Sequence, residues 1–184
     1  MSRSKLQLLG VAALMISCKH EEIDLPKADD FIYITDNAYT IDEIKKMEEE
    51  IAKTLNFNFL FPSSLSFFGI ISKKIGISED INKCKLGEFF MESFLIDSKS
   101  LCYSYSTIAC ASSYLIMKFY KMNGYKDLYS YKMIIGDESH KDIKECAKDL
   151  CFLVKHLSKS SLRATKDKYS LEEYDNVASI CESK

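Results

Sequence analysis

The stretch LQLLGVAALMI, residues 6–16, is the most informative part of this 184-residue chain. From residue 8 to residue 16 every position is apolar or glycine, so a helix formed here has no face left for water. A helix that is apolar all round is buried in a bundle or lies in a membrane. The run is shorter than the about 20 residues that span a bilayer. It therefore predicts the central helix of a bundle, whose polar end emerges at Lys19.

The same stretch has a second interpretation as a targeting segment. Basic Arg3 and Lys5, a short apolar run and a small residue before Cys18 are also typical of a secretory signal, including a lipoprotein signal. The cysteines argue against export, because their number is odd, 7, and no C-x-x-C pair occurs. Most of them lie inside apolar helical runs, where cysteine behaves as a small hydrophobic residue. An exported or lipid-anchored protein that uses Cys18 is one hypothesis at this point.

The amino-acid composition limits the possible fold classes and the possible classes of partner. Hydrophobic residues make up 47% of the chain, yet it contains only 2 Pro and 6 Gly, which favours helices over a many-turned β protein. The net charge of −2 gives no electrostatic basis for binding nucleic acid, which needs a clustered basic face. We therefore expect an all-α protein without a nucleic-acid partner.

A second helix is marked by its own cap. Thr40 followed by Glu43 forms a capping box, in which each residue satisfies a backbone group of the other. Apolar residues then recur at helical spacing, with charged residues between them. They are Ile41, Ile44, Met47, Ile51 and Leu55. The apolar run NFNFLFP, residues 56–62, ends this helix at a proline, and we place a domain boundary there.

The second half of the chain repeats this character. Helices are predicted over residues 63–75, 84–95, 103–120, 127–135 and 139–159. Residues 108–113 are small or apolar on all faces, which predicts the central helix of a second bundle. The apolar face of the last helix holds Ile143, Cys146, Ala147, Leu150, Phe152, Leu153 and Leu157. The two central helices lie about one hundred residues apart, which indicates duplicated bundles. The polar tail from Ser160 is expected to be irregular.

No pattern for catalysis or metal binding is present. The three histidines are far apart, and no H-E-x-x-H sequence occurs. A metal site built from Cys18, His20 and the adjacent Glu21 and Glu22 is disfavoured, because consecutive residues of a helix diverge. Catalytic triads, phosphate loops and glycine fingerprints are absent. The sequence predicts no enzyme activity, no catalytic residue, no metal, no cofactor and no small-molecule ligand.

Two segments carry a resemblance to a known family. KLQLLGVAALMISCKHEEI, residues 5–23, and ADDFIYITDNAYTIDEIKKMEEEIAKTLNFNF, residues 28–59, resemble the second half of the cyclin box of mitotic A/B-type cyclins. The family pattern runs KLQLVG-AA-LIA-KYEEI and then FVYITDDTYT. Residues 95–97, 104–120 and 168–178 resemble, less closely, parts of the cyclin C-terminal domain. The resemblance gives the opening apolar run a place inside a bundle and so argues against a targeting segment, and it implies no membrane association.

The resemblance implies two cyclin-box-type bundles in tandem. Residues 1–59 would form a partial N-terminal box with its third to fifth helices, residues 60–160 the C-terminal domain, and residues 161–184 an irregular tail. The first two helices of the first box, with the substrate-docking patch, would be missing, which would leave the helix of residues 6–16 partly bare. Either the true start of the protein lies upstream of Met1 or the gene is a degraded copy, and we favour the former.

The resemblance also implies a function. Members of this family bind and activate a cyclin-dependent kinase in cell-cycle control, in the nucleus and cytoplasm, without supplying a catalytic group. Lys19 and Glu48 match the lysine and glutamate that bond backbone groups beside the kinase C-helix. The apolar groove around them falls on His20, Ala52, Phe57 and Phe59. The family usually has an aromatic at the position of His20 and a leucine at that of Ala52, so we expect weaker binding or a different kinase. The alternative is a cyclin-fold interaction protein that has lost kinase activation.

Overall fold

The computed structural model describes residues 3–123 and 140–180, and these form two compact units. Unit 1 comprises Met1–Phe61 and unit 2 comprises Pro62–Lys184. Within the described ranges every regular element is a helix and no strand occurs, which confirms the predicted all-α class. None of the described helices is long and apolar enough to cross a membrane.

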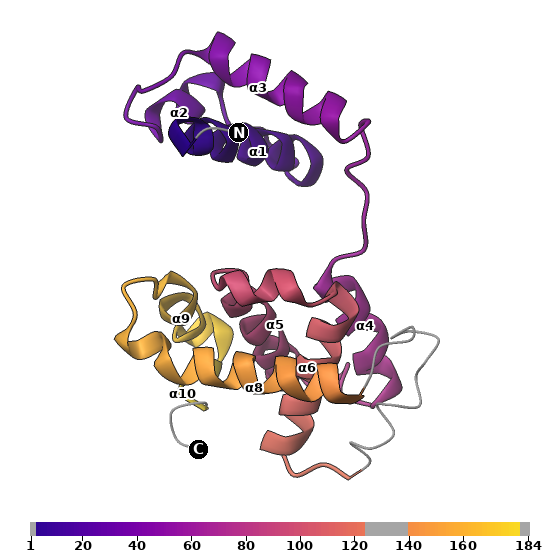
Figure 1. The fold of residues 1–184 in the computed structure, drawn as a ribbon. Helices are drawn as coiled ribbons and strands as arrows, with labels where there is room; N and C mark the ends of the chain where they lie inside the picture. The colour runs from indigo at the N-terminus through magenta and orange to yellow at the C-terminus, as the bar shows by residue number, and fades with distance from the viewer. Residues whose placement is uncertain (1–2, 124–139, 181–184) are drawn as a thin grey trace. The chain divides into compact units, whose positions relative to one another are not determined.

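Unit 1 is built around one pair of helices. The 3₁₀ helix η1 (Arg3–Lys5) leads into α1 (Leu6–Glu21), and the short α2 (Ala28–Tyr33) leads to α3 (Ile41–Thr54). α3 packs along α1, as Figure 1 shows. The core between them consists of Leu8, Val11, Ala12, Met15, Phe31, Ile44 and Met47.

Only one face of α1 is covered. Leu8, Val11 and Met15 are buried, whereas Leu14 keeps 46% of its surface exposed and Gly10 is exposed as well. Burial on every face, which the apolar run alone predicts, is therefore not observed, because α2 and α3 supply their buried side chains to the same stripe of α1. The partly bare helix that the resemblance implied is the arrangement seen. The apolar composition of α1 exceeds what unit 1 buries.

The predicted capping box of α3 is confirmed. The Thr40 hydroxyl accepts a hydrogen bond from the Glu43 backbone N–H at 3.3 Å. In return the Glu43 carboxylate accepts from the Thr40 N–H at 2.8 Å. The Thr40 hydroxyl also donates to this carboxylate at 2.9 Å. The two bonds that the carboxylate accepts lower the pKa of Glu43 below its usual value, since they favour the charged form. The start of α3 is thus fixed by two neighbouring side chains.

Unit 2 contains the longer series of helices. Its elements are α4 (Ser64–Lys74), α5 (Ile81–Phe94), η2 (Ser98–Cys102), α6 (Tyr105–Phe119), α8 (His140–His156), η4 (Leu157–Lys159), α9 (Ala164–Tyr169), η5 (Glu172–Tyr174) and α10 (Val177–Ile180). α5 begins three residues before the predicted start, because the Asp80 carboxylate caps it by accepting from the Lys83 N–H at 3.1 Å. The helix predicted over residues 127–135 lies outside the described residues.

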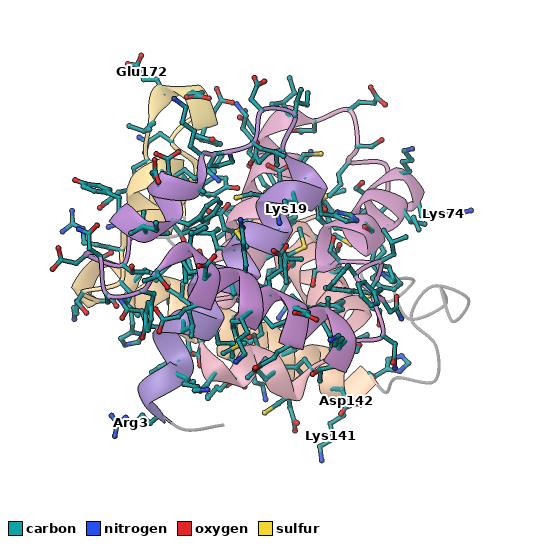
Figure 2. The ribbon with its side chains drawn as sticks, turned by 90° about the horizontal axis from the view of Figure 1, so that it is seen from above. Arg3, Lys19, Lys74, Lys141, Asp142 and Glu172 are labelled. Carbon is teal, nitrogen blue, oxygen red and sulfur yellow. The ribbon has the colours of Figure 1, made fainter. Side chains whose placement is uncertain are left out.

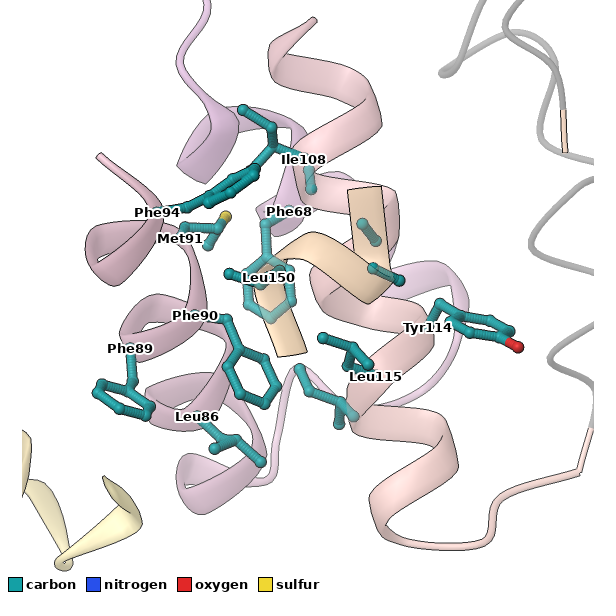
Figure 3. Close-up of a cluster of buried hydrophobic side chains, with 14 of the residues drawn as sticks. Phe68, Leu86, Phe89, Phe90, Met91, Phe94, Ile108, Tyr114, Leu115 and Leu150 are labelled. Atoms are coloured by element: carbon teal, nitrogen blue, oxygen red, sulfur yellow. The ribbon is translucent and has the colours of Figure 1, made fainter. Parts of the chain in front are cut away.

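α6 is the central helix of unit 2, as predicted. Every residue from Ser106 to Met117 is buried, and α6 packs against α4, α5 and α8. Its small side chains allow these helices to approach closely on several sides. Ser112 and Ser113 are accommodated because their hydroxyls donate to the carbonyls of Ile108 and Ala109. Figure 3 shows the Phe68 ring within the aromatic and aliphatic side chains of this core.

Two expectations for the end of the chain are wrong. The segment after Ser160 is not irregular, since α9 and α10 form there and bury Tyr169, Val177 and Ala178 in the unit 2 core. The Glu92 carboxylate holds this segment by accepting from Lys168 Nζ at 2.7 Å and from the Tyr169 hydroxyl at 3.0 Å. The sequence did not reveal these helices, because the few residues that they bury do not recur at helical spacing and most of the segment is polar. Phe152, expected on the buried face of α8, is 62% exposed.

Gly87 provides a test of the packing between α4 and α5. A Cβ at Gly87 would lie 2.3 Å from Cζ of the buried Phe68 ring, so Gly87→Ala forces the ring to move. We expect this overpacking to lower the free energy of unfolding by about 1–3 kcal/mol, measured by urea denaturation. Gly69→Ala in α4, where a Cβ meets nothing within 4 Å, should instead raise it by about 0.5–1 kcal/mol. Equal effects of the two substitutions would contradict the packing described here.

Candidate functional site

A groove in unit 1 brings all six sequence-predicted site residues together. The cavity has a volume of about 450 Å³ and lies between the last turns of α1, α3 and the turn that follows α3. We call it the α1/α3 groove. Its lining consists of Ile16, Lys19, His20, Lys45, Glu48, Glu49, Ala52, Phe57 and Phe59. That these residues contact a kinase stays a prediction.

The polar edge of the α1/α3 groove is an ion pair between its two helices. Lys19 Nζ of α1, labelled in Figure 2, lies 2.6 Å from Oε1 of Glu48 in α3. The two side chains are 49% and 22% exposed, so water reaches both charges. A pair in this environment contributes little to folding but holds a lysine and a carboxylate side by side. Both groups remain accessible to polar groups of another molecule.

The other charged residues of the groove are partly compensated. The Glu49 carboxylate accepts from Lys53 Nζ one turn later in α3, and this bond lowers the pKa of Glu49. His20 Nδ1 lies 2.7 Å from Oε1 of Glu21, outside the groove lining. Lys45 makes no ion pair or hydrogen bond with a described side chain, and it leaves one cationic edge uncompensated.

The apolar part of the groove comes from α3 and the turn behind it. Ala52 is 8% exposed and forms part of the wall, and its small side chain leaves space in front of it. Phe59 is half-buried, whereas Phe57 keeps 69% of its surface exposed. An exposed phenylalanine beside a polar rim is the composition expected where a second molecule packs.

The turn after α3 places the two phenylalanines. Asn56 and Phe57 both adopt left-handed backbone conformations, with φ of 50° and 57°. The Phe57 N–H donates to the Ala52 carbonyl at 2.8 Å, which closes the helix and turns the chain back toward the groove. A left-handed conformation costs a residue with a Cβ about 1–2 kcal/mol. Such strain concentrates at functional sites, where surrounding structure maintains it.

Sequence reasoning missed three lining residues. Ile16, Lys45 and Glu49 were not predicted, although helical spacing identifies them. Ile16 precedes Lys19 by three positions, and Lys45 and Glu49 lie on the same face of α3 as Glu48. Among the described residues, no group of histidine, cysteine and carboxylate side chains could hold a metal ion.

Comparison with known proteins identifies the family. The model of the cyclin N-terminal domain matches residues 1–60, and that of the cyclin C-terminal domain matches residues 62–183. The chain therefore belongs to the cyclin family, whose members are non-catalytic regulatory subunits.

Individual relatives are cyclins of the B and A types. The chain is 36% identical over 183 residues to the G2/mitotic-specific cyclin-B of Patella vulgata, a match that covers 100% of this chain and 44% of the relative. It is 35% identical over 178 residues to that of Spisula solidissima, covering 97% and 40%. Cyclin-A1-4 of Oryza sativa is 33% identical over 180 residues, covering 96% and 50%. The chain thus spans half or less of the length of these relatives.

The Lys19–Glu48 pair can be tested for its contribution to stability. A double-mutant cycle of Lys19→Ala and Glu48→Ala, measured by urea denaturation, should give a coupling energy of only about 0.2–1 kcal/mol, because both side chains reach water. The doubly substituted chain should keep the far-ultraviolet circular dichroism of the wild type. A coupling energy several times larger would mean that the pair supports the fold, and its removal could not then report on binding alone.

Proposed function

We propose that this chain is a regulatory subunit that binds and activates a cyclin-dependent kinase of the mitotic type, in the nucleus and cytoplasm. Membership of the cyclin family supports the class of partner. The observation that carries the proposal is that the residues matched to the family's kinase-contacting positions line a single groove. The cyclin-B names of the relatives support the mitotic type.

Lys19 and Glu48 would provide the orienting contacts. A lysine ammonium donates and a carboxylate accepts, so together they can satisfy a backbone carbonyl and a backbone N–H of one partner segment. Hydrogen bonds to charged groups are roughly twice as strong as neutral ones. In the free chain the two groups bond to each other at 2.6 Å. Binding would therefore exchange part of this ion pair for contacts with the kinase.

Activation would follow from selective binding to one kinase conformation. A kinase is active when the Lys–Glu ion pair between its β3 strand and its C-helix is formed. A subunit that binds this arrangement more tightly than the inactive one shifts the population toward it. In this mechanism the groove needs shape and hydrogen-bonding groups but no catalytic residue.

Two groove residues would tune the affinity. His20 and Ala52 replace the aromatic and the leucine that are usual in the family, and both line the cavity. Burial of apolar surface is worth roughly 25 cal/mol per Å², so a smaller and more polar wall gives a weaker contact. We propose that the chain binds its kinase more weakly than a typical mitotic cyclin, or prefers a different kinase.

A second candidate function is a cyclin-fold interaction protein that no longer activates a kinase. The substitutions at His20 and Ala52 favour it, as does the uncovered face of α1, where Leu14 is 46% exposed. Such a protein could still bind a kinase through the α1/α3 groove. Kinase binding and kinase activity therefore have to be measured separately.

The decisive experiment is a pull-down of purified cyclin-dependent kinases by the immobilised chain, followed by a histone kinase assay on the beads. We expect the wild type to retain an active kinase, and Lys19→Ala/Glu48→Ala to retain at most a tenth as much, because both orienting bonds are lost. Lys46→Ala/Glu50→Ala is the matched control, since it removes the same two charge types from α3 outside the groove. It should behave like the wild type.

Each result of this experiment separates the candidates. A bound but inactive kinase would support the interaction protein and overturn activation. A folded wild-type chain that retains none of the kinases would overturn both forms of the proposal for this chain. If the two double variants retained equal amounts of kinase, the kinase contact would lie outside the α1/α3 groove.

The role of Ala52 predicts a gain of binding. Ala52→Leu adds three carbon atoms to the groove wall and should lower the kinase Kd at least tenfold, because burial of two of them at about 0.8 kcal/mol each already gives this factor. The measurement is a titration by surface plasmon resonance with the kinase that the pull-down identifies. Ala13→Leu makes the same change at an exposed position of α1 outside the groove and should leave the Kd unchanged. An unchanged Kd for Ala52→Leu would exclude Ala52 from the interface.

A further inference from the structure

Unit 2 contains a groove at the position that corresponds to the α1/α3 groove of unit 1. Its cavity has a volume of about 640 Å³ and lies between α6 and α8. α6 packs against α8 as α1 packs against α3. We call this cavity the α6/α8 groove. Its lining consists of Tyr114, Leu115, Lys118, Phe119, Lys121, Lys144, Ala147, Lys148, Cys151, Phe152 and Lys155.

The two grooves agree in register, residue by residue. Seven lining positions of the α1/α3 groove have a counterpart exactly 99 positions later that lines the α6/α8 groove. The counterparts, in order, are Ile16 and Leu115, Lys19 and Lys118, His20 and Phe119, Lys45 and Lys144, Glu48 and Ala147, Glu49 and Lys148, and Ala52 and Cys151. The core follows the same spacing, since Val11, Met15 and Ile44 correspond to the buried Cys110, Tyr114 and Ile143. The same positions of the repeated helix pair therefore line a groove in each unit.

The chemistry of the second surface differs from that of the first. Both carboxylates of the α1/α3 groove are replaced, Glu48 by Ala147 and Glu49 by Lys148. No carboxylate is among the lining residues of the α6/α8 groove, whereas five of them are lysines. Lys121, Lys148 and Lys155 form no ion pair with a described residue, so their charge is not compensated within the described part of unit 2.

Two carboxylates of α8 have partners that do not line the groove. Asp149 accepts from Lys99 Nζ at 2.6 Å and from the Tyr103 hydroxyl at 2.8 Å. Glu145 lies 3.9 Å from Lys141. Neither acidic residue lines the groove. The charges of Lys121, Lys148 and Lys155 are therefore available to a molecule that binds there.

The floor of the groove is apolar and one aromatic side chain is exposed beside it. Leu115 and Ala147 are buried in the unit 2 core, and the labelled Tyr114 in Figure 3 lies at the edge of that core with its hydroxyl pointing outward. Phe152 is 62% exposed, and its ring lies 4.2 Å from the His156 ring, centroid to centroid. An apolar floor fits an apolar side chain, and the lysine rim fits carboxylates around it.

We propose that the α6/α8 groove is a second docking surface, which takes an acidic amphipathic helix of a partner protein. The partner inserts apolar side chains at helical spacing against the floor and places glutamates or aspartates opposite Lys148 and Lys155. Helices commonly bind apolar grooves in this way, with specificity set by charges at the rim. This site is separate from the α1/α3 groove, and its occupancy does not depend on the function proposed for that groove.

The test is a fluorescence-anisotropy titration of the full chain with a synthetic peptide. The probe is a labelled helical peptide with leucines on one face and glutamates on the other. A second peptide carries lysines in place of the glutamates, and a third has the composition of the probe in permuted order. We expect the probe alone to bind, with an affinity that falls as salt is raised, because the lysines reach water.

Substitutions assign the binding to the groove. Lys148→Glu/Lys155→Glu should weaken probe binding at least tenfold, and Phe152→Ala at least threefold. Lys73→Glu/Lys74→Glu makes the same change in net charge at the end of α4, where Lys74 projects outward in Figure 2, and should alter the affinity less than twofold. All of these side chains are exposed, and circular dichroism of each variant checks that the fold is retained.

Four results would overturn the proposal. The first is that the probe does not bind measurably, and the second is that the permuted peptide binds as tightly as the probe. The third is that the probe binds Lys148→Glu/Lys155→Glu as tightly as the wild type. The fourth is that a single-stranded DNA oligonucleotide binds the chain more tightly than the probe does. Self-association of the chain that Lys148→Glu/Lys155→Glu abolishes, seen by analytical ultracentrifugation, would assign the groove to a second copy instead.

Discussion

Both units depend on the packing of a small-residue helix against an amphipathic helix. In unit 1 this pair is α1 with α3, and in unit 2 it is α6 with α8. Small side chains such as Ala12 and Ala111, both fully buried, let the helix backbones approach closely. The register of each pair then decides which residues face the core and which face the groove beside it. The binding surfaces are thus a consequence of the same contact that forms the cores.

Charge distinguishes two surfaces that share one backbone arrangement. In the α1/α3 groove a lysine and a carboxylate from different helices bond at 2.6 Å. In the corresponding place of unit 2, Lys118 is retained but the carboxylate position is Ala147. A groove with both signs of charge suits a partner with backbone donors and acceptors, and a groove with lysines suits carboxylates. Duplication of a fold can in this way provide two recognition sites of different chemistry.

How much of the structure the sequence could predict depended on the strength of the local sequence pattern. Strong local patterns succeeded: Thr40 and Glu43 fix the start of α3, and the small residues of α6 are buried as expected. Weak patterns failed, since the few apolar residues after Ser160 do not reveal α9 and α10, which form because Tyr169 has a buried place against α5. Phe152 was expected with the apolar residues of α8 but is exposed, because it follows the buried Leu150 by two positions, about 200° around the helix, and so lies off the buried face.

The sequence by itself determined the helical class, the repeat of about one hundred residues and the resemblance from which all six candidate site residues were named. Those properties are local or depend on direct comparison of residues. Only the tertiary structure decided that the six residues line one cavity, that Lys19 and Glu48 bond to each other, and that the apolar character of α1 is used on one face. Lys19 and Glu48 are 29 positions apart, and contacts of this kind are determined by helix packing rather than by spacing along the chain.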